Sequence, residues 1–384
     1  MRFLTAGESH GQKLVGIIEG LPSGVKISKE QVDKALRKRQ QGPGRGGRMA
    51  IEQDEVQLVS GVRGGLSTGA PIALEILNRD WENWEKIMTW REEADLESRR
   101  VMTPRPGHAD LSGALKYRTE VRNILERASA RETAMRVAIG SIARQMLTTL
   151  GVEIKGHVLA VGGVHAKCTD EGDYWQRVRQ SEWSVGDPFA EQQMGERLIL
   201  AREQGESLGG LLEVQVHHVP VGLGSHVQWD RKLDGKIAQA VLSVQAMKGI
   251  SFGLGFEAAD RVGSKVHDQI CYKKGQGFGR ASNHAGGIEG GMSNGEPIIL
   301  QAVMKPIPTL YQPLNTVHLV TKEVVKASVE RSDICAVPAA LVVLEHVVAW
   351  VIAEAVLEKF TADSFSELQT AWEEYEKNLL QIEF

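Results

Sequence analysis

A short basic, glycine-rich stretch carries the clearest chemistry in the sequence. Residues 37–49 (RKRQQGPGRGGRM) contain Arg37, Lys38, Arg39, Arg45 and Arg48. Guanidinium groups donate forked hydrogen bonds that match phosphate and carboxylate oxygens, and the intervening glycines let the backbone approach a ligand closely. We therefore expect a multiply charged anion to bind here. By charge alone, a solvated basic loop or a weak nucleic-acid patch fits equally well.

Two histidines and one aspartate occupy polar loops in which packing of a core is not expected. His10 lies in GESHG (7–11), and His108 lies in RPGHAD (105–110) between Arg105 and an aspartate. Asp333 stands just before an apolar helical stretch. Side chains of these types exchange protons with a substrate, so they indicate acid–base chemistry on an anion.

Further polar and glycine-rich loops indicate where the rest of a site lies. RASARET (127–133) leads into a helix whose first amides favour anions. Residues 282–295 are mostly glycine and small polar residues, and KPIPT occupies 305–309. Each stretch alone is also typical of ordinary turns and caps.

The elements that must position these loops can be read from periodicity. Residues 2–6, 13–20, 56–62 and 71–77 are typical of strands, and Ser28 with Gln31 has the spacing of a capping box that opens a helix at 28–39. Residues 131–150 and the strongly apolar 338–359 are predicted as buried helices, and 230–247 as a further helix. Residues 79–104 are predicted to form a long flap or an interface loop, and 365–384 an acidic amphipathic helix.

A repeated motif indicates that the chain consists of two related halves. GGLSTGAPIAL (64–74) and GGMSNGEPIIL (290–300) share seven of eleven residues, although chance similarity of glycine-rich turns is the alternative. We expect one α+β domain over 1–384, with halves at about 1–160 and 209–360 and a helical insertion at about 165–208. Two buried helices between two antiparallel sheets, a β-α-β sandwich, is the predicted architecture, with the two copies in different sheets.

Composition excludes several classes of protein. The net charge of −4 disfavours a generally basic nucleic-acid binder. Three distant cysteines without a CxxC pair indicate neither disulfides nor a metal site, and Cys335 is expected to be a small buried side chain. The polar groups at Glu345, His346 and Glu354 argue against a membrane span in the most apolar stretch, and the N-terminus lacks the pattern of a signal peptide. We therefore expect a cytoplasmic protein with neither a membrane nor a nucleic-acid partner.

The sequence resembles the chorismate synthase family over nearly its full length. The motifs that carry the resemblance are GESHG (7–11), GRGGRM (44–49), RPGHAD (105–110), RASARET (127–133), QAMKGI (245–250), GGIEGGMSNG (286–295), KPIPT (305–309) and RSDICAVPA (331–339). The resemblance implies a β-α-β sandwich, a homotetramer, and conversion of 5-enolpyruvylshikimate 3-phosphate to chorismate and phosphate. It also implies that reduced FMN is required without being consumed. Since no flavin-reductase domain is evident, a separate reductase is expected to supply it.

The same resemblance implies a role for each site residue. His10 protonates the leaving phosphate, His108 stabilises the anionic reduced flavin, and Asp333 helps to remove the C6 proton. The expected substrate phosphate or NADP ligands are Arg39, Arg45, Arg48 and Arg105. The expected FMN ligands are Arg127, Ala128, Ser129, Gln245, Ala246, Gly290, Lys305, Pro306, Ile307, Pro308, Thr309 and Arg331. Ser332 and Ser251 depart from residues common in the family, and neither is among these ligands.

Two other functions use some of the same features. A flavin-dependent oxidoreductase acting on a phosphorylated anion would need stoichiometric reductant, whereas the elimination needs only a catalytic amount. A nucleic-acid binder built on residues 37–49 would leave His10, His108 and Asp333 without a role, and that stretch has no aromatic residue to stack on a base.

Overall fold

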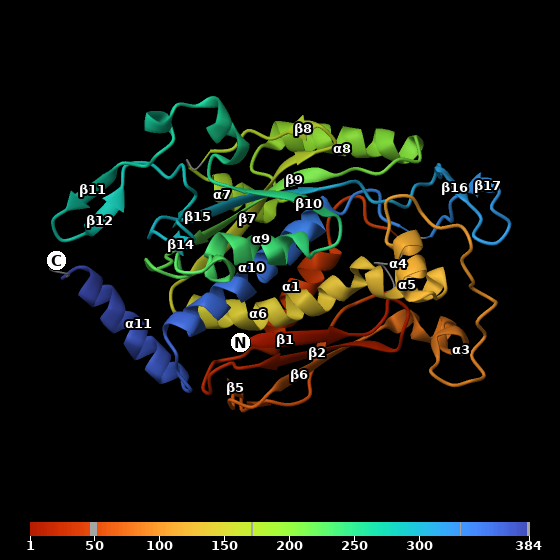
Figure 1. The fold of residues 1–384 in the computed structure, drawn as a ribbon, viewed down its shortest axis with the longest axis horizontal. Helices are drawn as coiled ribbons and strands as arrows, with labels where there is room; N and C mark the ends of the chain where they lie inside the picture. Colours follow the sequence, from red (N-terminus) through yellow and green to blue (C-terminus); the bar gives the residue numbers. More distant parts are fainter. Residues whose placement is uncertain (47–51, 170–171, 331, 382–384) are drawn as a thin grey trace.

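The computed structural model describes residues 1–46, 52–169, 172–330 and 332–381. The chain forms two antiparallel sheets, short two-stranded ribbons and a set of helices (Figure 1). The mixed helix and sheet content that the sequence predicts is confirmed.

The first sheet is built by the N-terminal part of the chain. Its strands, in spatial order, are β1 (Arg2–Ala6), β2 (Lys13–Glu19), β6 (Ile72–Leu77) and β3 (Val56–Leu58). Alternate residues of β6 are buried, because successive side chains of a strand point to opposite faces. The predicted strand at 56–62 is shorter than expected. The chain turns at Gly61, where φ is +77°, before β4 (Val62–Arg63) pairs with β5 (Leu66–Ser67).

The second sheet is built mainly by the later part of the chain. Its spatial order is β10 (Met247–Phe252), β15 (Ile298–Met304), β9 (Gly210–His217), β7 (Glu153–Val161) and β8 (Val164–His165). The repeated motif leads into β6 in one copy and into β15 in the other, so the copies lie in different sheets. α7 (Tyr174–Gln180) covers one face of this sheet, where the Tyr174 hydroxyl lies 2.6 Å from Nδ1 of His157.

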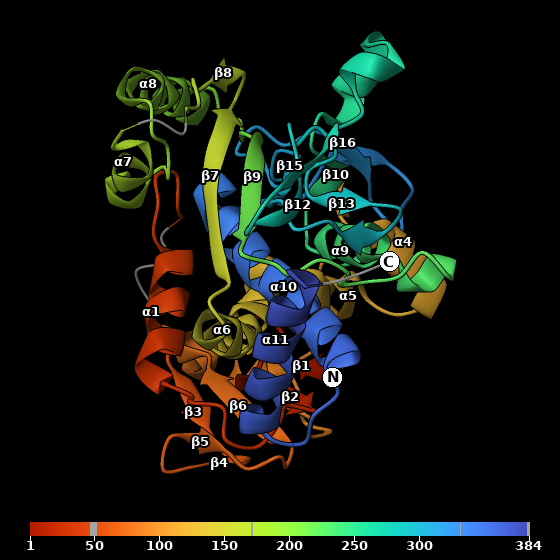
Figure 2. The ribbon, with the colours of Figure 1, turned by 90° about the vertical axis from the view of Figure 1, so that its left-hand side faces the viewer.

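Two long helices lie between the sheets and hold the core together (Figure 2). α6 (Thr133–Thr149) packs on β2 and β6, α10 (Val337–Lys359) packs on β7 and β9, and the two helices pack on each other. Their close approach requires Gly140, because a Cβ atom there would lie 2.2 Å from the carbonyl oxygen of His346. α10 is long and apolar enough to cross a membrane, but 89% of that stretch is buried, so it is a core helix.

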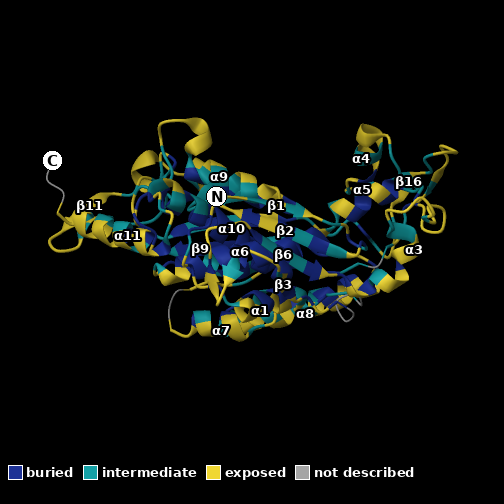
Figure 3. Ribbon diagram, turned by 90° about the horizontal axis from the view of Figure 1, so that it is seen from below, coloured by how far each residue is buried: buried dark blue, intermediate teal, exposed yellow. Residues whose placement is uncertain are grey.

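The remaining elements surround this core (Figure 3). α1 (Lys29–Gln40) begins after Ser28, whose side chain accepts a hydrogen bond from the amide of Gln31. The predicted capping box is only half formed, because the amide of Ser28 donates to Oε1 of Gln145 at 2.7 Å. α9 (Leu233–Leu242) is shorter than the predicted helix at 230–247, because a 3₁₀ turn precedes it and β10 begins at Met247. The region 165–208 contains α7 and a further helix at Pro188–Glu203. The other elements are η1 (Arg79–Asn83), α3 (Glu85–Met88), α4 (Asp110–Tyr117), α5 (Val121–Ala128), η2 (Ala130–Glu132), α8 (Pro188–Glu203), α11 (Phe365–Leu379), β11 (Ile270–Lys273), β12 (Gly277–Arg280), β13 (Ile288–Glu289), β14 (Met292–Ser293), β16 (Asn315–Val317) and β17 (Val324–Lys326).

Candidate active site

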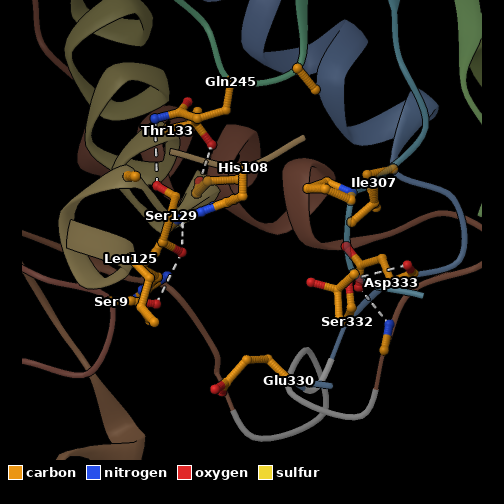
Figure 4. Close-up of a pocket in the computed structure, with 18 of the residues that line it drawn as sticks. Ser9, His108, Leu125, Ser129, Thr133, Gln245, Ile307, Glu330, Ser332 and Asp333 are labelled. Carbon is orange, nitrogen blue, oxygen red and sulfur yellow. Dashed lines mark hydrogen bonds between the residues drawn. The ribbon is translucent and has the colours of Figure 1, made fainter. Parts of the chain in front are cut away.

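A cavity of about 1020 Å³ brings together segments that are distant in the sequence. Its walls come from the β1–β2 loop, the end of α1, the segment before α4, the turn between α5 and α6, the loop after β15 and the start of α10. Figure 4 shows Ser9, Ser129 and Gln245 on one side of this space and Ser332 and Asp333 on the other. His10, His108 and Asp333 all line it, so the three predicted acid–base residues share one site.

His10 is held by a buried carboxylate that the sequence analysis did not identify. Its Nδ1 atom lies 2.9 and 3.0 Å from the two carboxylate oxygens of Glu126, and its backbone amide donates to Glu126 at 2.8 Å. The ring stacks on Trp84, with the centroids 3.9 Å apart. Burial alone would raise the pKa of Glu126, but its hydrogen bonds and charge interactions with His10 and Arg122 lower it. Glu126 is therefore a carboxylate that accepts hydrogen bonds.

His108 is held in a similar way, by a nearby residue. Its Nδ1 atom hydrogen-bonds to Asp110, whose side chain is fully buried. Arg105 donates to both oxygens of Asp110, at 2.9 and 3.2 Å, and to Oγ1 of Thr309 at 3.0 Å. Burial alone would raise the pKa of Asp110, but the bonds from His108 and Arg105 lower it well below its usual range. Much of the Arg105 guanidinium is therefore engaged in orienting the histidine loop.

A second group of arginines gives the cavity its positive charge. Arg39 donates to Oγ1 of Thr133 at 3.0 Å and to the carbonyl of Ala130 at 2.8 Å. Its Nη1 atom is buried without a hydrogen-bond partner among the described residues. Burial lowers the pKa of Arg39 to about 10, and the charge of Asp54 only partly opposes this.

Arg131 is a second buried arginine, and it was not singled out from the sequence. Its Nη1 atom donates to Asp54 at 2.6 and 2.7 Å, and its Nη2 atom also lacks a hydrogen-bond partner within the described ranges. Buried N–H groups are rarely left without a partner, so such groups facing a cavity indicate an anion site.

Asp333 lies on the opposite wall and is paired with the basic loop. Its carboxylate accepts from Nη1 of Arg45 at 2.5 Å and from the amide of Gly46 at 2.6 Å. The neighbouring Cys335 is fully buried, as predicted, and burial raises the pKa of its thiol to about 11. That thiol therefore remains protonated near neutral pH and is a packing group.

Most of the residues predicted to contact FMN line the same cavity. These are Ala128, Ser129, Gln245, Ala246, Lys305, Ile307, Pro308 and Thr309. Three others lie elsewhere in this chain. Arg127 is exposed and donates to the carbonyls of Thr5 and Gly7, Pro306 is not part of the lining, and Gly290 lies in the turn between β13 and β14. The predicted ligands Arg48 and Arg331 lie outside the described residues.

The residues that the sequence analysis missed share one property. Glu126, Arg131, Asp54 and Trp84 are buried, and each acts by contacting another site residue rather than by standing in a recognisable loop. The only sequence signal was indirect, since Arg131 lies within the motif RASARET (127–133) that was chosen as a site loop and Glu126 directly precedes it.

Comparisons with known proteins show the family of the chain. The family model "Chorismate synthase" matches residues 1–357. The chain is 69% identical to the chorismate synthase of Desulfitobacterium hafniense strain DSM 10664, covering 98% of this chain and 99% of the relative. It is 53% identical to that of Desulforamulus reducens, with full coverage of both. A solved structure described as "Crystal Structure of Chorismate Synthase" is similar with a TM-score of 0.80 and 40% identity, covering 99% of this chain and 98% of the other. The chain therefore belongs to the chorismate synthase family and is a shikimate-pathway lyase.

Proposed function

We propose that this enzyme converts 5-enolpyruvylshikimate 3-phosphate to chorismate and phosphate by an anti-1,4-elimination, with reduced FMN required and not consumed. The observation that carries the proposal is a single cavity in which buried arginines, two carboxylate-bound histidines and Asp333 face the same space. Expulsion of phosphate needs cations around the leaving group, and loss of the C6 hydrogen needs a base.

Arg39 and Arg45 bind and neutralise the phosphate, together with Arg48 from the same loop. The buried Nη1 atom of Arg39 supports this role, because an anion in the cavity supplies the acceptor that the described residues lack. Arg105 contributes positive charge from the cavity wall while its guanidinium holds Asp110. The same cations suit the phosphates of NADP.

His10 donates a proton to the departing phosphate, and Asp333 serves the removal of the proton from C6. The position of both residues on the cavity lining, on segments from opposite ends of the chain, supports a division of acid and base between two sides of the substrate. His108 lines the same cavity as Lys305 and Thr309, and its proposed role is to stabilise the negative charge of the reduced flavin. The Asp110 carboxylate fixes Nδ1 of His108 as the bonded nitrogen.

The polar and apolar groups of the described residues match those of a flavin. A buried Oε1 atom of Gln245 lacks a donor within the described parts of the chain, and a flavin ring system carries N–H groups that could satisfy it. Apolar side chains of Ile307, Ala340 and Val343 offer a wall for a flat ring. The proposed binding residues are those predicted from the family motifs, including Arg127, Gly290 and Arg331. When bound, reduced FMN supplies an electron transiently, which is why no net oxidation is expected.

We also propose that the architecture is a duplicated β-α-β sandwich within a single domain. The hydrogen bonds around the repeated motif support this, because each half has the same set. In one half the serine of the motif, Ser67, donates to the carbonyl of Pro22 at 2.6 Å and accepts from the amide of Val25 at 2.8 Å. In the other half, Ser293 donates to Pro220 at 2.6 Å and accepts from Leu223 at 2.8 Å.

The proposal includes a cytoplasmic homotetramer that receives reduced FMN from a separate reductase. The family resemblance alone supports the tetramer, whereas the other two points are expectations from the sequence. Light scattering of the purified enzyme tests the tetramer, and the need for an added reductant in the assay tests the external supply of reduced flavin.

The experiment that tests the function is an anaerobic reaction with a large excess of substrate over dithionite-reduced FMN. We expect one phosphate and one chorismate for each substrate consumed, at many turnovers for each flavin. If product never exceeds the amount of reductant added, the enzyme carries out net redox chemistry and the elimination is wrong. That outcome would support the alternative, a flavin-dependent oxidoreductase that acts on a phosphorylated anion.

A further inference from the structure

We propose that Glu126 is the positioning residue that makes His10 a directional proton donor, with the transferable proton on Nε2. The inference deepens the proposed function, since it rests on His10 as the acid that protonates the leaving phosphate. Glu126 does not line the cavity, so it acts on the substrate only through His10.

The contacts between Glu126 and the His10 loop are numerous and short. Both carboxylate oxygens lie within 3.0 Å of Nδ1, and one also accepts from the backbone amide of His10 at 2.8 Å. The backbone carbonyl of Glu126 accepts from the amide of Ser9 at 2.9 Å. One residue at the end of α5 thus holds both the main chain and the imidazole of the β1–β2 loop.

The protonation state of Glu126 decides which nitrogen of His10 carries the proton that moves. The interactions with His10 and Arg122 lower the pKa of Glu126 although burial opposes them, so the group is ionised and only accepts hydrogen bonds. Nδ1 must therefore carry a hydrogen in both the charged and the neutral ring. The hydrogen that is lost and regained is consequently the one on Nε2, to which none of the described residues is hydrogen-bonded.

Two further contacts keep this arrangement in place. Trp84 stacks on the imidazole at a centroid distance of 3.9 Å and an angle of 23°, and its indole N–H donates to Asp80 at 3.1 Å. The stacking opposes rotation of the ring out of its plane. Arg122 donates to Glu126 from one helical turn earlier, at 3.3 Å, which holds the carboxylate in its position.

Glu126→Gln tests the proposal in the full-length enzyme with reduced FMN. The amide keeps the shape of the side chain, but it can donate to Nδ1 and so permits the other tautomer. We expect kcat to fall about 10- to 100-fold, the range known for carboxylates that orient metal-ligating histidines, with KM changed less than about twofold. Glu345→Gln is the matched control, because Glu345 is also a buried carboxylate paired with one arginine, Arg144, and lies outside the cavity.

A double-mutant cycle separates positioning from a purely structural role. If Glu126 acts through His10, adding Glu126→Gln to His10→Ala should change kcat less than about twofold, whereas independent effects would multiply. An equal loss in both backgrounds would overturn the proposal. If Glu126→Gln does not fold, Glu126→Asp in the same cycle decides. Loss of the proposed function itself is distinguishable, because wild-type enzyme would then fail to release phosphate with catalytic flavin.

Discussion

Arg39→Lys tests whether the buried arginine at the end of α1 binds the anionic substrate. Two of its nitrogens are already used, at 3.0 Å from Thr133 and 2.8 Å from the carbonyl of Ala130. The third, Nη1, is buried, lacks a hydrogen-bond partner among the described residues and lies 3.7 Å from Asp54. A lysine keeps the charge but has one nitrogen on a flexible chain, so it cannot keep both protein contacts and also reach the ligand.

The expected loss of substrate affinity follows from the free energy that one charge-assisted hydrogen bond contributes. Such a bond contributes about 1.5–3 kcal/mol, which corresponds to a roughly 10- to 150-fold rise in the substrate Kd. At a substrate concentration about 100 times the wild-type Kd, ligand stabilisation of about 2.7 kcal/mol should fall to between about 1.4 and 0.3 kcal/mol. Titration calorimetry without reductant measures the Kd, and ligand-dependent thermal unfolding measures the stabilisation.

Arg37→Lys is the matched control for this experiment. This substitution makes the same chemical change on the same helix, two residues before Arg39, and the Arg37 side chain is exposed. We expect its substrate Kd to stay within about twofold of the wild-type value, as for most exposed substitutions. If Arg39→Lys also stays within twofold while remaining folded, the Arg39 guanidinium does not bind the substrate. Its role would then be to tie α1 to the turn before α6.

Three further predictions concern other buried or catalytic groups. Asp333→Asn should slow the elimination by about 10²–10⁴-fold, measured in a single turnover with substrate deuterated at C6; a normal rate with an unchanged isotope effect would contradict it. His108→Ala should change the absorption spectrum of bound reduced FMN, and an unchanged spectrum would remove His108 from the flavin site. Burial lowers the pKa of His157, but its interactions with Cys168 and with Glu213, which lies 3.0 Å from Nε2, raise it from 6.5 to about 9. The charged ring therefore contributes its full stabilisation below pH 6.5, and this stabilisation is lost as the pH rises through 9. At 1.36 kcal/mol per pKa unit, the loss in the free energy of unfolding is at most about 3 kcal/mol. Glu213→Gln should flatten this fall in urea unfolding, and an equal slope in both proteins would refute the assignment.

The elements that the sequence predicts well are those whose pattern is local. Ser28 and Gln31 are three residues apart, and the Ser28 half of the predicted capping box is present. α6 and α10 begin and end within two residues of their predicted positions, because burial on most faces imposes long runs of small and apolar side chains. Where a prediction failed, a turn with its own geometry interrupts the hydrophobic pattern. At Gly61 a turn ends the strand predicted at 56–62. At Trp229–Arg231 a 3₁₀ turn delays the start of the helix predicted at 230–247.

The residue types of the candidate site were predictable, but most of its pairings were not. Asp110 lies two residues from His108, and the loop RPGHAD displays both. Glu126 lies 116 residues from His10, and nothing in either segment predicts that the two side chains are in contact. Trp84 shows the same limit. Its polar, tryptophan-rich stretch predicted a flap or an interface loop, whereas the structure buries Trp84 against the His10 ring.

Charge explains why the partners in this cavity come from distant segments. The basic stretch at 37–49 contains no acidic residue, yet the structure buries Arg39 almost completely. A buried guanidinium is costly unless a carboxylate or another acceptor lies near it, so the fold must bring one from elsewhere. Asp54 lies 3.7 Å from Arg39, and Asp333, from the far end of the chain, lies 2.5 Å from Arg45. A like-charged loop therefore indicates that an anion binds, whereas the acid that balances it in the free enzyme is a property of the whole fold.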